Sequence, residues 1–233
     1  MRARSRALLA ASAALLLAAA RTAVAQHGAA GCRRTDPVRT FTLDGTTNVD
    51  LRRPATFRCT LHAGGPVRRV VLAGNAVDGS PETLRIGGPH PQAFRLGEAN
   101  TTLPAGSPYL RAEDLNRDGW TDLMVLLTTG VNGQEWYAVF LYAPGRGRFV
   151  EDDTIFGSAN IERIAGRPCV RSTENYLYLL TWEEYCWRGG RWSRVRDVRR
   201  EFPAAGVEIR TRRTFHRGRR TEVTVDTLRE AGR

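Results

Sequence analysis

One short stretch of the chain has the residue types and spacing of a metal-binding loop. Residues 114–122 read Asp-Leu-Asn-Arg-Asp-Gly-Trp-Thr-Asp, which follows the pattern D-x-N-x-D-G-x-x-D. Hard cations such as calcium take about six to eight oxygen ligands. Oxygens at the first, third, fifth and ninth positions and a carbonyl at the seventh can surround one ion, and the glycine allows a sharp turn. The predicted calcium ligands are Asp114, Asn116, Asp118, the carbonyl of Trp120, and Asp122.

This loop differs from an EF-hand in two respects. Val125 stands at the twelfth position, where an EF-hand carries a bidentate Glu, and an apolar strand follows in place of a helix. A turn rich in Asp and Asn that binds no metal is the alternative. If calcium binds, we expect a structural role, because the ion would neutralise three carboxylates and fix the loop to the strand that follows.

The elements around the loop are predicted to be β-strands. Apolar and polar residues alternate with a period of two, whereas a helical period is not sustained over any long segment. The fold class is therefore all-β, an antiparallel meander of hairpins that a sandwich, a barrel or a propeller-like ring would each satisfy. The expected strands cover residues 39–43, 56–62, 67–72, 83–86, 93–96, 122–129, 134–142, 148–150, 175–187, 191–202, 207–215 and 221–228.

Composition and the N-terminal residues narrow the class of protein. With 233 residues, 42% hydrophobic and 25% charged, the chain is neither disordered, collagen-like nor a multi-span membrane protein. Arginines precede an apolar run at 7–20 and the small residues Ala23 and Ala25, as in a secretory signal. That run is shorter than the roughly 20 residues of a membrane helix. We expect a signal peptide at 1–25, one all-β domain at 26–233 with any seam near 99–107, and a periplasmic or secreted location.

The four cysteines fit an exported protein. Cys32, Cys59, Cys169 and Cys186 are an even number, which indicates disulfides in an oxidising compartment. Three pairings are possible, and proximity in the sequence favours Cys32 with Cys59 and Cys169 with Cys186. The absence of a C-x-x-C pair disfavours a zinc site. Lipid attachment at Cys32, which follows Ala-Ala-Gly, is a competing interpretation.

The loop and the residues that follow it resemble a known family. A D-x-N-x-D-G-x-x-D-L loop before a strand is similar to the calcium loop of FG-GAP or integrin-type repeats in β-propellers. The downstream order resembles small exported Gram-negative proteins with a propeller-like β fold, some of which are periplasmic immunity proteins that inhibit lysozyme-like effectors of a type IV secretion system. The resemblance covers residues 111–202. The Cys169–Cys186 pair within that range and the strands after Phe202 are not features of that family. Its further residues are Trp136, Tyr137, Phe140, Tyr142, the turn 144–147, Phe149, Tyr185 and Trp187.

The resemblance implies a binding protein that inhibits a lysozyme-like cell-wall hydrolase. An envelope adhesion or scaffolding module that binds a glycan or a protein is the alternative function. We do not expect an enzyme, because the four His are scattered, no G-x-S-x-G motif is present, and paired cysteines are not nucleophiles. The expected partner is a protein, with no nucleic acid, no membrane span, and a monomer or weak dimer.

Two regions carry side chains that suit binding. Tyr and Trp residues in the segment 175–187 suggest an aromatic edge that could enter a carbohydrate cleft between two carboxylates, where a Tyr hydroxyl, an amide or a guanidinium would bind them. Residues 187–220 are rich in Arg and could attract anions, but a merely solvated face is the favoured interpretation because all 35 basic residues of the chain, whose net charge is +11, are Arg. The predicted partner-binding residues are Arg171, Asn175, Tyr176, Tyr178 and Tyr185.

Overall fold

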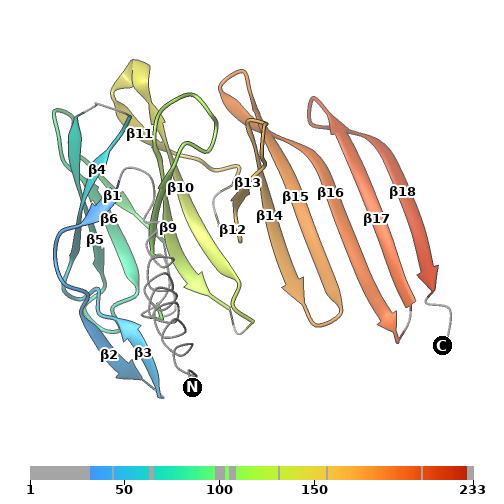
Figure 1. The fold of residues 1–233 in the computed structure, drawn as a ribbon, viewed down its shortest axis with the longest axis horizontal. Helices are drawn as coiled ribbons and strands as arrows, with labels where there is room; N and C mark the ends of the chain where they lie inside the picture. Colours follow the sequence, from blue (N-terminus) through green and yellow to red (C-terminus); the bar gives the residue numbers. More distant parts are fainter. Residues whose placement is uncertain are drawn as a thin grey trace, which may run out of the picture.

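The described part of the chain is built from antiparallel β-strands. A computed structural model describes residues 32–43, 45–62, 66–97, 103–104, 109–130, 132–155, 157–205 and 207–229. The expected signal peptide, its cleavage site and most of the expected seam at 99–107 lie outside these residues. Three larger sheets follow one another along the chain, and their colours run from blue to red across Figure 1.

The first sheet has the strand order β1-β4-β5-β6-β7 and one strongly apolar face. Along β4 and β5 every second residue is buried, because successive side chains of a strand point to opposite faces. The Cys32–Cys59 disulfide joins β1 to β4 at directly paired positions. A separate hairpin of β2 and β3 lies between β1 and β4 in the chain. The bounds are β1 Cys32–Arg34, β2 Thr40–Leu43, β3 Thr46–Val49, β4 Ala55–Thr60, β5 Val67–Gly74, β6 Pro81–Ile86 and β7 Gln92–Arg95.

The central sheet holds the most deeply buried strands. Its order is β11-β10-β9-β8, and the short strand β12 also pairs with β10. The first five residues of β9 and six consecutive residues of β10 are buried, so both faces of these strands are covered. A 3-10 turn, Pro144–Arg146, joins β10 to β11. The bounds are β8 Leu110–Glu113, β9 Asp122–Thr129, β10 Glu135–Ala143, β11 Arg148–Glu151 and β12 Ser158–Ala159.

The third sheet is a meander of six strands in sequence order, from β13 to β18. The Cys169–Cys186 disulfide joins the paired strands β14 and β15. No residue of β17 or β18 is buried, and β18 forms the outer edge at the right of Figure 1. The pairing of β17 with β18 shifts by one residue between Thr214 and Phe215, where Thr221 is the extra residue. The bounds are β13 Glu162–Arg163, β14 Cys169–Tyr176, β15 Leu179–Arg188, β16 Arg191–Ala204, β17 Val207–His216 and β18 Arg219–Arg229.

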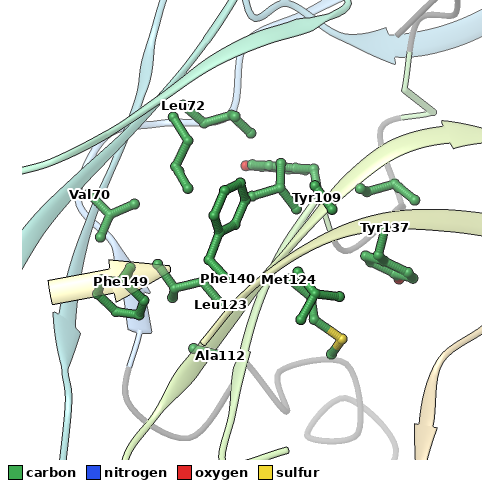
Figure 2. Packing of buried hydrophobic residues seen from close by; sticks show 14 of the residues in the cluster. Val70, Leu72, Tyr109, Ala112, Leu123, Met124, Tyr137, Phe140 and Phe149 are labelled. Carbon is green, nitrogen blue, oxygen red and sulfur yellow. The ribbon is translucent and has the colours of Figure 1, made fainter. Parts of the chain in front are cut away.

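The main core lies between the first and central sheets. Figure 2 shows Val70 and Leu72 of β5 pointing toward Phe140 of β10, with Tyr109 beside them. Phe94 of β7 packs on Phe140 with a ring-centroid distance of 4.7 Å. The third sheet is attached to the central one through Asn160, whose side chain accepts a hydrogen bond from the Glu135 amide and donates one to the Thr173 carbonyl. The acidic loop stands at the end of the central sheet, before β9.

The all-β prediction and both favoured disulfides are confirmed. The described strands do not form a closed barrel. The expected single strand at 175–187 is wrong, because the chain turns at Leu177 and Tyr178 and the region contributes the end of β14 and the whole of β15. Tyr176 and Tyr178 continue the period of two through this turn, so the alternation alone gave no sign of it. The described residues contain no helix of the length and apolarity needed to cross a membrane.

Candidate functional site

The acidic loop connects β8 to β9 and folds tightly around its own side chains. Gly119 has a φ of +87° and Arg117 a φ of +59°, so the chain reverses within a few residues. Asp114 accepts hydrogen bonds from the amides of Asp118 (3.1 Å) and Gly119 (3.0 Å). Asp118 accepts one from the Trp120 amide at 2.9 Å. These bonds satisfy the backbone of the loop with its own carboxylates.

Asn116 completes this network. Its side-chain oxygen accepts a hydrogen bond from the Asp118 amide at 3.1 Å, and its amide group donates to the Asp118 carboxylate at 3.0 Å. The Asn116 residue is buried. The amide and the carboxylates of Asp114 and Asp118 are thus held within a few residues of one another, and all present oxygen atoms of the kind that calcium prefers.

Asp122 is the most deeply placed member of the loop, with no exposed surface. One carboxylate oxygen accepts a hydrogen bond from the Leu115 amide and the other from the Tyr142 amide, both at 2.9 Å. Burial, together with the charges of Asp118 and Asp114, raises the pKa of Asp122 to about 8, although the hydrogen bonds from the two amides act in the opposite direction. Asp122 therefore connects the start of the loop to β10, and its charge is poorly compensated.

The charge balance of the loop fits a cation. Although the protein is rich in Arg, the structure shows no ion pair to Asp114, Asp118 or Asp122 in its described residues. In the same residues, no three His, Cys, Asp or Glu side chains converge closely enough to hold a metal ion. A bound ion would therefore have to draw the carboxylates inward from their present backbone partners. The donor set of hard oxygens suits calcium, and its occupancy stays a prediction.

Trp120 packs the loop against both neighbouring layers. Its ring lies edge-on to His62 at a centroid distance of 4.3 Å and tilted over Tyr142 at 5.0 Å. The next residue, Thr121, donates its amide to the Leu61 carbonyl at 2.7 Å. The loop thus connects the end of β4 in the first sheet to β10 in the central sheet, so a change in the shape of the loop would alter the packing of both sheets. The sequence singled out Trp120 for its carbonyl alone and gave no sign of the role of its ring.

A hollow of about 370 Å³ lies beside the loop, between the central and third sheets. Its lining includes Asp118, Tyr142, Asp152 and Trp187. Asp152 accepts hydrogen bonds from the Thr154 and Ile155 amides, so it closes a turn. Burial raises the pKa of Asp152. No pattern in the sequence indicated this hollow.

The tip of the β14–β15 hairpin is the most exposed apolar point of the third sheet. Tyr176, Leu177 and Tyr178 are 48%, 93% and 72% exposed. The base of the tip is fixed, because Gln134 of the central sheet accepts a hydrogen bond from the Asn175 amide at 2.9 Å and donates one to its carbonyl at 2.6 Å. Three large side chains are therefore held in solvent on a rigid hairpin.

The structure divides the predicted partner-binding residues into two groups. Asn175, Tyr176 and Tyr178 lie together at the tip. Arg171 lies further along β14 and forms an ion pair at 2.8 Å with Glu184, which is buried. Tyr185 lies further along β15, partly buried, and its hydroxyl donates to Glu183. Burial and the Glu183 carboxylate raise the pKa of Tyr185. Arg171 and Tyr185 thus have side-chain partners within the sheet and lie away from the tip, although the Arg171 side chain stays exposed.

Comparisons with known proteins support the fold and leave the function open. No family model matches this sequence, and no curated protein matches it either. Among solved structures, it is similar to one described as a Xanthomonas type IV secretion system related protein, with a TM-score of 0.52 and 13% sequence identity. The similarity covers 77% of this chain and 98% of that one. At this identity the likeness concerns the fold alone.

Proposed function

We propose that this chain is an exported protein of the bacterial envelope that binds and inhibits a lysozyme-like cell-wall hydrolase. The observation that carries the proposal is the exposed tip formed by Tyr176, Leu177 and Tyr178. Two disulfides and a structural neighbour described as related to a type IV secretion system are consistent with a protein that functions outside the cytosol.

The chemistry of the tip suits the cleft of such a hydrolase. Lysozyme-like enzymes hold two carboxyl groups on either side of the glycosidic bond. A Tyr ring brings a large apolar surface at little entropic cost, and its hydroxyl can hydrogen-bond a carboxylate where a sugar would otherwise lie. Exposed aromatic anchors are also the residues that most often dominate the binding energy of an interface. The tip would block the cleft as an inhibitor, without turnover.

Calcium would have a supporting role in this proposal. An ion bound by Asp114, Asn116, Asp118, Asp122 and the Trp120 carbonyl would lie at one end of the central sheet. The base of the tip rests on this sheet through Gln134. It would neutralise the three carboxylates and fix the loop. The residues of the chain itself would do the binding.

The test is an inhibition assay with a matched control. Lysozyme-type hydrolases from the same genome are mixed with the wild type, with Tyr176→Ala/Tyr178→Ala, or with Val223→Ala/Val225→Ala, and clearing of a peptidoglycan suspension is followed. The control pair removes exposed apolar side chains from β18, far from the tip. We expect the wild type and the control to slow at least one hydrolase and the tip variant to lose that effect at an unchanged melting temperature.

Two results would contradict the proposal. If none of the hydrolases is bound or slowed by the wild type, the inhibitor function is wrong. If the tip variant inhibits as well as the control, inhibition does not depend on the tip.

A further inference from the structure

The solvent-facing side of the first sheet carries a row of arginines with no acidic partners. Arg33 of β1, Arg58 of β4 and Arg69 of β5 are directly paired across the three strands. Arg85 of β6 lies opposite Val71, the next outward-facing residue of β5. All four side chains are exposed. Figure 2 shows Val70 and Leu72 directed into the core, so their neighbours Arg69 and Val71 face the other way.

This arrangement is unfavourable for the isolated protein. Side chains directly opposite each other on neighbouring strands lie about 4.5–5.5 Å apart at Cβ, and like charges in such positions repel. In the described part of the chain, none of the four guanidinium groups forms an ion pair or a side-chain hydrogen bond. The repulsion is thus left uncompensated within the molecule.

The Arg-rich segment near the C-terminus is organised differently. Six of its arginines form ion pairs with acids on the same sheet, among them Arg200 with Glu208 at 2.6 Å and Arg213 with Asp197 at 3.4 Å. Other arginines of the same segment, among them Arg188, Arg191 and Arg212, have no ion pair in the described residues, so unpaired Arg is not confined to the first sheet. The first sheet differs because three of its arginines without ion pairs lie directly opposite one another on three neighbouring strands.

Three arginines of the row, Arg58, Arg69 and Arg85, line a continuous groove, and Arg33 lies directly opposite Arg58. One hollow of about 390 Å³ is lined by Thr35, Thr56, Arg58, Val67 and Arg69. A second, of about 690 Å³, shares Thr56 and Arg69 with the first and continues over Val71 and Arg85 to Gln92 and Ala93. The groove therefore crosses the sheet from the end of β1 to β7. Gly87 and Ala93, which have no side chain or a small one, also line the second hollow.

We propose that this groove binds a linear anionic polysaccharide, with Arg33, Arg58, Arg69 and Arg85 contacting its carboxylate, sulfate or phosphate groups. A guanidinium can donate two parallel hydrogen bonds to such a group. Thr56 lies between the arginines and offers a hydroxyl to the neutral part of a sugar ring. A groove that runs across several strands fits a chain-like occupant better than the flat surface of a membrane. The glycan would hold the protein at the cell surface, independently of the tip and the acidic loop.

Single-stranded nucleic acid fits the groove less well. Proteins that bind it combine positive charge with aromatic rings on which the bases stack. The described residues that line the two hollows include no aromatic side chain. The anionic groups would thus be recognised without any stacking platform.

The test compares two variants that each lose four positive charges. One is Arg33→Gln/Arg58→Gln/Arg69→Gln/Arg85→Gln. The control changes four exposed arginines of the outer strands β17 and β18 in the same way: Arg212, Arg219, Arg220 and Arg229. Binding of polygalacturonate, heparin and neutral dextran is measured at two or more salt concentrations, beside a single-stranded oligodeoxynucleotide and phosphatidylglycerol vesicles.

We expect the wild type to bind at least one of the two anionic glycans more tightly than dextran, the oligonucleotide or the vesicles. The groove variant should bind about tenfold more weakly and with a smaller salt dependence, because charge-assisted contacts are lost, whereas the control should keep its affinity. Equal loss in both variants, or tighter binding of the oligonucleotide or the vesicles, would overturn the proposal. Because the change relieves repulsion between opposite arginines, the groove variant should melt no lower than the wild type. If it fails to fold, protection of the four arginines of the wild type from phenylglyoxal by the bound glycan decides the question, and absence of protection counts against it.

Discussion

Removal of calcium should lower the stability of this protein by a measurable and loop-specific amount. The loop holds Asp114, Asp118 and Asp122 without an ion pair from any described residue, so a bound cation would supply the missing positive charge and would favour the ionised form of Asp122, whose pKa is raised to about 8. At free calcium of about 100 times the dissociation constant, linkage adds about 2.7 kcal/mol to the free energy of unfolding. For a domain of this size, about 1 kcal/mol corresponds to about 2–4 °C. We therefore expect EGTA to lower the melting temperature by about 5–11 °C.

The Asp114→Ala variant separates metal binding from the structural hydrogen bonds of the loop. Asp114 accepts hydrogen bonds from two backbone amides, each worth about 0.5–1.5 kcal/mol, so this variant should be less stable even with EGTA present. Its melting temperature should then respond little to calcium. Glu162→Ala, which removes an exposed carboxylate from β13, should keep the full response.

Differential scanning calorimetry with and without EGTA, together with titration calorimetry of calcium into the stripped protein, gives both the shift and the stoichiometry. We expect one ion per chain. If the wild type melts at the same temperature with and without EGTA, or if Asp114→Ala retains the whole shift, the loop is not a calcium site.

Three further outcomes are expected. Replacing Cys169 and Cys186 by Ser opens a loop with a sequence separation of 17 residues and should cost about 3 kcal/mol, measured by urea unfolding; a loss below about 1 kcal/mol would refute this. Phe140→Ala empties a fully buried site between the first and central sheets and should cost about 3–5 kcal/mol in the same assay, whereas a cost near zero would show that these sheets do not share a core. Arg200 and Arg210 lower the pKa of Glu208 to about 2, so the stabilising effect of these ion pairs is complete above the ordinary Glu range and is lost as the pH falls toward 2. The protection factors of the β16–β17 amides against hydrogen exchange, which correct for the intrinsic pH dependence of the exchange rate, should therefore fall below about pH 4 in the wild type but show little pH dependence of this origin in Glu208→Gln. Identical profiles would contradict the assignment.

The sequence predicted the local elements well where side-chain alternation and turn residues agree. The strand at 122–129 was expected with its observed bounds, because the apolar residues after Asp122 are continuous and a glycine turn follows. Both disulfides followed from proximity along the chain, and their paired strands place the cysteines directly opposite each other. The strand β8 was missed because it is short and its four residues, Leu-Arg-Ala-Glu, show little alternation, and the turn at Leu177 and Tyr178 was missed because no glycine or proline marks it.

The features that depend on contacts between distant segments could not be predicted. The deep burial of Asp122 arises because the Tyr142 amide, twenty residues away, closes over its carboxylate. Arg171 and Tyr185 lie away from the tip because the chain turns at Leu177 and Tyr178, which places Arg171 opposite Glu184 and Tyr185 opposite Val170 further along the hairpin. The arginine row became visible only through the registers of three strands, because Arg33, Arg58 and Arg69 have no periodic relation in the sequence.

The irregular pairing at Thr221 affects how the molecule behaves at high concentration. A long, regular outer strand offers its free amides and carbonyls to any other chain, and stacking of such edges leads to aggregation. Here the extra residue interrupts the straight run near the start of β18, and this strand carries charged side chains of both signs, Glu222 and Asp226 beside three arginines. An approaching second copy therefore meets an irregular, strongly hydrated edge, which protects a thin, uncovered sheet from fibre growth.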